Sequence, residues 1–157
     1  MKLQIGISQE HLKNSIAILS SILANEMTLY VKLRKFHWNV SGESFMEFHK
    51  LFEGQYTELE TSIDEIAERI SKLGGKTIGT MKEFSDLTII KESPNQYPSR
   101  KDMVKELLQD HETVIVHLRK DVNTSAEENQ DAGTADFLTG LMQAHETMSW
   151  TLRRYLE

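Results

Sequence analysis

Two histidines and three acidic residues carry the chemistry that this sequence could perform. The histidines, His37 and His49, stand among aromatic residues on either side of Gly42. The acidic residues that follow are Glu53, Asp64 and Glu68. Neutral imidazoles and carboxylates suit Fe(II), Mn(II) and Zn(II), and the lack of cysteine excludes a thiolate site. A site rich in negatively charged oxygen ligands would also stabilise Fe(III), so the residue types favour iron redox chemistry.

A single helix cannot bring these residues together around one ion. Residues 44–73 have apolar positions that alternate by three and four without a break, which predicts one helix about 45 Å long. On that helix the three carboxylates follow a stripe beside the apolar face. His49 and Asp64 are fifteen residues apart, which corresponds to about 22 Å along the axis. Because metal–ligand bonds are about 2 Å long, these two residues of one helix cannot share an ion.

A second copy of the helix, packed antiparallel, would remove this difficulty. The midpoint in sequence between His49 and Glu68 lies between residues 58 and 59. Glu53 and Asp64 share that centre. A two-fold axis there would place His49 opposite Glu68 of the partner subunit, and Glu53 opposite Asp64 of the partner subunit. The spacing therefore predicts two equivalent metal sites per dimer, each shared between subunits.

The helices that must position these residues can be expected from the glycines, the prolines and the apolar periodicity. The expected ranges are 8–38, 44–73, 99–124 and 134–156, with a short helix at about 80–87. Ser44 and Glu47 have the spacing of a capping box, and Gly74 and Gly75 supply a stop. Four long helices with one long crossover are typical of a ferritin-like bundle. We predict an all-α fold with one domain spanning residues 1–157.

The short connection between the first two helices determines where His37 lies. Because that turn is centred near residues 41–42, His37 falls within about one helical turn of the level of His49. We therefore expect His37 to complete the same cluster. The aromatic residues of the second helix are interpreted as core residues: Phe45, Phe48, Phe52 and Tyr56.

Composition and charge narrow the classes of function. The formal net charge is −6, and the first thirty residues contain only two lysines and no arginine, so a DNA-binding basic arm is not expected. No run approaches the roughly 18 apolar residues of a membrane span, and the N-terminus lacks a signal peptide's apolar core. These features, with the absence of cysteine, favour a cytoplasmic protein that attracts cations.

The same residues resemble the Dps family, mini-ferritins named as DNA-binding proteins from starved cells. The resemblance rests on HWNVSGESFMEFHKLFEGQY, on DEIAERI and LGG, and on TADFL at the last helix, and it covers essentially the whole chain. It implies a hollow shell of twelve subunits, built from two-fold dimers. Ferroxidase centres at the two-fold interfaces would oxidise Fe(II), preferentially with hydrogen peroxide, and the ferric mineral would be stored inside.

The resemblance also implies roles for individual residues. His37, His49 and Glu53 would bind metal from one subunit, while Asp64 and Glu68 would come from the partner. Many members carry Asp at position 53, so the longer Glu53 could coordinate differently. Trp38 would stand beside the centre and take part in electron transfer. Family members that bind DNA directly often have a lysine-rich tail that this chain lacks, so DNA binding is expected to be weak or absent, and nucleoid association stays open.

Other polar residues have more than one interpretation. Four acidic residues surround the last loop and the start of the last helix: Glu127, Glu128, Asp131 and Asp136. They are typical of a solvated, helix-capping loop, and the family alternative is an acidic pore through which Fe(II) is drawn inward, with Asp131 and Asp136 as the main contributors. His111 and His145 fall on inward stripes and are interpreted as core or interface histidines. Glu26 interrupts an apolar stripe, either near a site or paired with Arg or Lys.

These observations predict a mini-ferritin that oxidises and stores iron and so protects DNA, with Zn or Mn as other metals that suit the site. Two rivals remain. A ferritin or bacterioferritin would need Glu-x-x-His pairs within one bundle, and no histidine here has a glutamate three residues before it. A DNA-compacting or structural shell without metal chemistry would be marked by lost ligands, and all five are present.

Overall fold

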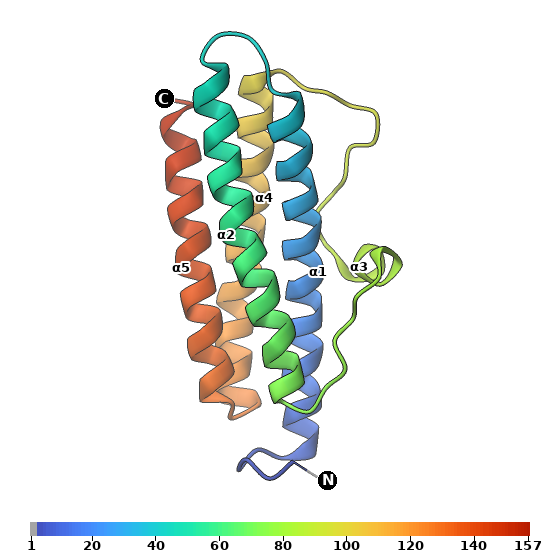
Figure 1. Cartoon of the computed structure of the whole chain (residues 1–157). Coiled ribbons are helices and arrows are strands. Elements are labelled where there is room, and N and C mark those ends of the chain that lie inside the picture. Colours follow the sequence, from blue (N-terminus) through green and yellow to red (C-terminus); the bar gives the residue numbers. More distant parts are fainter. Residues whose placement is uncertain (1–2) are drawn as a thin grey trace.

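The chain folds into four long helices packed side by side, with a crossover that runs outside the bundle (Figure 1). The computed structural model describes residues 3–157. The elements in order are α1 (Gln9–Asn39), α2 (Phe45–Lys72), α3 (Met81–Leu87), α4 (Arg100–Asn123), the π-helix η1 (Thr124–Glu128) and α5 (Ala132–Arg154). Helices are the only regular elements among these residues, and the predicted all-α bundle with one long crossover is confirmed. The crossover between α2 and α4 carries α3, which packs beside α1.

Most helix starts follow the expected side-chain chemistry. The Ser8 hydroxyl accepts a hydrogen bond from the His11 amide at 3.1 Å, and the Ser99 hydroxyl accepts one from the Asp102 amide at 3.3 Å. Such caps satisfy amide groups that have no partner inside the helix. They explain why α1 and α4 begin immediately after these serines.

The start of α2 differs from the expected capping box. Ser44 lies in the left-handed region (φ 58°), and its hydroxyl makes no capping hydrogen bond. Its backbone carbonyl instead accepts the amides of Glu47 at 3.1 Å and Phe48 at 3.2 Å. The Glu47 carboxylate interacts with Tyr155, where burial and this neighbour raise the pKa of the phenol. The sequence pattern was therefore present, but the tight turn after Gly42 (φ 89°) placed the serine in another conformation.

The end of α4 and the start of α5 also differ from expectation. The polar stretch after α4 was expected to be loop, but its first five residues continue the chain as the π-helix η1. The helix α5 begins at Ala132, two residues before the expected Thr134, because Asp131 rather than Thr134 is its N-cap. The Asp131 carboxylate accepts the Thr134 amide at 2.9 Å.

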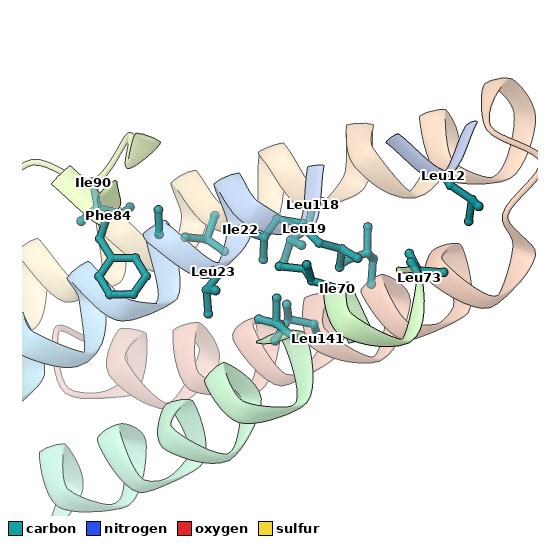
Figure 2. Close-up of a cluster of buried hydrophobic side chains, with 14 residues drawn as sticks. Leu12, Leu19, Ile22, Leu23, Ile70, Leu73, Phe84, Ile90, Leu118 and Leu141 are labelled. Atoms are coloured by element: carbon teal, nitrogen blue, oxygen red, sulfur yellow. The ribbon is translucent and has the colours of Figure 1, made fainter. Parts of the chain in front are cut away.

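The core consists of two clusters of buried side chains, one toward each end of the bundle. The first joins the N-terminal half of α1 to the C-terminal half of α2, to α4 and α5, and to Phe84 of α3 (Figure 2). The second joins the other halves of the long helices and includes Phe36, Phe52 and Leu107. Phe48, Phe52 and Tyr56 are buried as expected, but Phe45 is 38% exposed in the single chain, so its assignment to the core was wrong for the isolated subunit.

The helix α1 is long and apolar enough to span a membrane, judged by length and composition alone. An 18-residue window of α1 is apolar enough, contrary to the expectation that no segment approaches a span. More than half of that window is buried inside the bundle, where α1 supplies core residues to both clusters. The core role of α1 accounts for this apolar character without a membrane.

Gly75 gives a direct test of the packing beneath the α2 C-terminus. A Cβ at Gly75 would lie 2.9 Å from Cγ2 of Ile70 and 3.0 Å from two atoms of Ile16. Gly75→Ala should therefore destabilise the fold by about 1–3 kcal/mol through overpacking, measured from the urea midpoint. Gly79→Ala, where no atom lies within 4 Å of the added Cβ, is the matched control. Equal stability of the two variants would contradict this packing.

Candidate metal centre

The hairpin of α1 and α2 brings the two predicted histidine ligands into contact. His37 lies in the last turn of α1 and is 8% exposed, and His49 lies in the second turn of α2. Their rings are stacked, with centroids 3.7 Å apart and planes inclined by 19°. The short turn after α1 therefore places both imidazoles at one level, as the sequence predicted for this pair.

Two reciprocal hydrogen bonds hold these imidazoles. Nδ1 of His37 lies 2.8 Å from the backbone carbonyl of His49, and Nδ1 of His49 lies 2.9 Å from the carbonyl of His37. A carbonyl only accepts, so each Nδ1 must carry the proton and donate. In a neutral imidazole this leaves a lone pair on Nε2. The two rings are thus set in the tautomer in which Nε2 is available to bind a metal ion.

Aromatic side chains limit how the two rings can move. The Tyr56 ring meets His37 edge-on with centroids 5.2 Å apart, and the Phe45 ring lies 5.0 Å from His49. Tyr56 was interpreted only as a core residue, and its contact with His37 was not foreseen. Trp38, predicted to stand beside the centre, is 67% exposed in the single subunit.

The three predicted acidic ligands are not brought together with the histidines in one chain. Glu53, Asp64 and Glu68 are all exposed on α2. The Glu68 carboxylate is paired instead with Lys72, one turn further along, at 3.0 Å. Within residues 3–157, no group of three or more His, Cys, Asp or Glu side chains is close enough to hold a metal ion. One subunit therefore brings together two imidazole donors, and the described carboxylates do not converge with them.

The acidic residues near the start of α5 have two different environments. Glu127, Glu128 and Asp136 are exposed, so their charges face solvent. Asp131 is 1% exposed and its carboxylate is occupied by Thr134 and by Arg69, 3.4 Å away. The helix-capping interpretation therefore fits Asp131, because its carboxylate caps the N-terminus of α5, while the alternative of an acidic pore stays a prediction.

Sequence reasoning left three other polar residues without a joint role. Glu26, His111 and His145 are each 0% exposed in the middle of the bundle. The interpretation of the histidines as core residues is confirmed, but Glu26 is bonded to His145 at 2.7 Å rather than to Arg or Lys. The signal was present in the sequence, because each of the three residues interrupts an apolar stripe.

Comparisons with known proteins agree with this fold. The ferritin-like domain model matches residues 16–157. An uncharacterised low temperature-induced protein of Nostoc sp. is 45% identical over 156 residues, which are 99% of this chain and 87% of that protein. DNA protection during starvation protein 2 of Bacillus anthracis is 38% identical over 144 residues, which are 92% of this chain and 97% of that protein. The chain belongs to the Dps family of ferritin-like proteins.

A solved Dps structure extends this comparison to three dimensions. The Dps protein of Vibrio cholerae O1 matches with a TM-score of 0.89 and 25% identity, over 99% of this chain and 100% of that one. It is described as a member of a broad superfamily of ferritin-like diiron-carboxylate proteins. The resemblance that the histidine and acidic motifs indicated is thus confirmed at the level of the family.

The Asp131 cap yields a stability prediction for this Dps chain. Asp131→Ala should destabilise the fold by about 1–2 kcal/mol, because it removes the α5 cap and the partner of Arg69. Asp136→Ala, an exposed acid in the first turns of α5, should change stability by about 0.5 kcal/mol or less. Urea unfolding at neutral pH compares the two variants, and equal midpoints would contradict the assigned cap.

Asp131 should also affect how the free energy of unfolding changes at acidic pH. Burial alone would raise the pKa of the Asp131 carboxyl, but hydrogen bonds from Thr134 and the Arg69 guanidinium hold it below its ordinary value of 3.8. A lowered folded pKa stabilises the protein above the unfolded pKa, and this contribution disappears as the pH falls through the folded pKa. The difference between the native chain and Asp131→Ala should therefore shrink below pH 3.8.

Proposed function

We propose that this Dps chain oxidises Fe(II) at centres shared by two subunits and stores the Fe(III) product within a hollow shell, preferentially using hydrogen peroxide. The observation that supports this best is the His37–His49 pair, whose Nε2 atoms are free to bind while both Nδ1 atoms are occupied. Its donor chemistry suits iron, and Zn(II) and Mn(II) suit the same ligands. Membership of the Dps family agrees with iron as the cargo.

The carboxylates would come from both copies of α2 in an antiparallel pair. Glu53 lies one turn after His49 on the same helix. Asp64 and Glu68 are exposed, and so are available to a second subunit. In a two-fold dimer, Asp64 and Glu68 of the partner subunit would approach His49, and Glu68 would have to leave Lys72. This deficit of ligands in one chain is the reason for proposing a shared centre.

The redox step that we propose balances with two irons for each peroxide. Each Fe(II) gives up one electron, and the O–O bond of hydrogen peroxide breaks as it takes up two electrons and two protons to form two water molecules. The protein holds the two irons in a carboxylate-rich site where Fe(III) is favoured. Consuming Fe(II) and peroxide together would protect DNA and the rest of the cell from hydroxyl radicals.

The proposal extends to the shell and its openings. We infer a cytoplasmic homo-oligomer of twelve subunits, assembled from two-fold dimers. The exposed Glu127, Glu128 and Asp136 would attract Fe(II) toward an acidic pore. Trp38 is exposed in the subunit and would stand beside the centre once the partner is present.

A subunit-mixing experiment tests the shared centre. His37→Ala/His49→Ala and Asp64→Ala/Glu68→Ala should each abolish fast Fe(II) oxidation with peroxide. In a mixed dimer, one site combines the altered histidines of one variant with the altered acids of the other. The second site combines the unaltered acids and unaltered histidines, so it is intact. Random reassembly of equal amounts should therefore restore about a quarter of the native activity, since half of the dimers are mixed. Activity is measured from Fe(III) absorbance after the two variants are unfolded and refolded together.

The controls for the mixing experiment are the native protein taken through the same procedure and each variant refolded alone. Differently tagged subunits show by co-purification that mixed dimers have formed. If mixed dimers form and the mixture stays as inactive as its components, the centre is not shared between subunits. If either variant alone keeps the native rate, the assigned ligands are wrong, and a shell without metal chemistry becomes the better account.

DNA binding can be tested separately from iron oxidation. The net charge of −6 and the scarcity of basic residues at the N-terminus predict weak or no retardation of duplex DNA in a gel-shift assay. Measurements at low and physiological salt distinguish electrostatic association, which should vanish as salt rises, from specific binding. A salt-resistant complex would contradict the proposal that DNA is protected indirectly.

A further inference from the structure

A polar layer divides the hydrophobic core of this bundle into two halves. Glu26 of α1, His111 of α4 and His145 of α5 are each 0% exposed. On every one of these helices the polar residue separates positions of the first core cluster from positions of the second. The flanking pairs are Leu23 and Leu29 on α1, Leu107 and Val114 on α4, and Leu141 and Met148 on α5.

The three residues form one chain of hydrogen bonds across the bundle. Nε2 of His145 lies 2.7 Å from Oε1 of Glu26, and Nδ1 of His145 lies 2.8 Å from Nδ1 of His111. The atoms at the two ends of this series of hydrogen bonds, Oε2 of Glu26 and Nε2 of His111, have no hydrogen-bond partner. Buried polar atoms without partners are costly, so this layer is a sensitive point in an otherwise apolar interior.

The geometry does not suit a metal ion. Glu26 and His111 meet opposite nitrogens of the His145 ring, so the three side chains do not converge on one point. An ion between the two Nδ1 atoms would have only two nitrogen ligands from this layer. The arrangement instead suits a proton, because one proton is required between two Nδ1 atoms that are 2.8 Å apart.

A further proton on His111 has no acceptor. If Nδ1 of His111 already donates to His145, the added proton sits on Nε2, which has no partner. If His145 donates instead, the added proton on Nδ1 of His111 faces another N–H at hydrogen-bond distance. In either state no described carboxylate touches His111 itself, because Glu26 contacts His145 and not His111. Burial, and then the neighbouring His145, accordingly lower the pKa of His111 well below its ordinary value of 6.5.

We propose that Glu26, His145 and His111 form an acid-sensitive latch, which ties α1, α4 and α5 together while His111 is neutral and loosens the middle of the bundle when His111 is protonated. The two core clusters meet at this layer, so its loss uncouples one half of the bundle from the other. The proposal does not depend on the iron chemistry, because none of the three residues belongs to the candidate metal centre.

Among residues 3–157, no carboxylate contacts His111 directly to balance a positive charge on its ring. Glu26 of α1 reaches it only through His145 of α5. Other charged side chains of α1, α4 and α5 form ion pairs of their own: Lys32 with Asp110 and Glu106, Arg119 with Glu146, and Arg153 with Glu112. The buried residues of α2 include no carboxylate, imidazole or amine, and Glu127 and Glu128 of η1 are exposed.

The sign of the pH effect follows from the direction of the shift. The folded protein holds His111 neutral at a pH where the unfolded chain would bind a proton, so the unfolded state takes up more protons below pH 6.5. Stability contributed by neutral His111 is therefore present above pH 6.5 and is lost as the pH falls below it.

His111→Gln tests the latch, because glutamine is polar but does not titrate. Between pH 7.5 and 5.5, the unfolding equilibrium constant of the native chain should rise about tenfold more than that of His111→Gln, which corresponds to one proton and an ordinary pKa near 6.5. Urea unfolding at each pH gives the constants. His117→Gln removes an exposed histidine from the same helix and should keep the native pH dependence. The latch is refuted if His111→Gln and His117→Gln have the same pH dependence as the native chain.

Hydrogen exchange on the unmodified protein keeps the proposal testable if His111→Gln does not fold. After correction for the intrinsic effect of pH on exchange, peptides covering 107–114 and 141–148 should lose protection between pH 7.5 and 5.5. Peptides from the ends of the bundle, such as 12–19, should lose less. Unchanged protection at 107–114 and 141–148, or a loss that is uniform along the bundle, would overturn the latch.

Discussion

The two hydrogen bonds that His37 and His49 exchange with each other's backbone carbonyls govern what this subunit can do. Each bond occupies an Nδ1 and leaves an Nε2 lone pair, which is the state that the proposed metal centre requires. They depend on the turn at Gly42 and Ser44, which brings the end of α1 beside the start of α2. The tight helical hairpin and the chemistry of the candidate site therefore have a common cause.

The same rigidity explains why the site cannot be completed within one chain. The helix α2 is 28 residues long and places His49 near one end and Glu68 near the other. No rotation of side chains closes that distance, and in the proposed centre a second α2 running the other way would supply carboxylates to the histidines. If the centre is shared as proposed, iron oxidation depends on the assembly of two subunits.

Regular features were predicted well from the sequence, and features set by tertiary context were not. The apolar periodicity gave the long helices, and the Ser99 cap gave the start of α4. The pattern at Ser44 failed because a left-handed turn residue cannot also present its hydroxyl as expected. The capping role of Asp131 was among the sequence-based interpretations, but its burial and its contact with Arg69 depend on tertiary packing. The link from Glu26 to His145 spans 119 positions, beyond the reach of any local pattern.

Anomalous diffraction at the iron edge, from crystals soaked anaerobically in Fe(II), tests the shared centre most directly. The account predicts iron peaks at the two-fold interface, bounded by Nε2 of His37 and His49 from one subunit and by the carboxylates of Asp64 and Glu68 of the partner subunit. Iron bound within a single bundle would contradict it, as would an interface in which two α2 helices do not meet antiparallel.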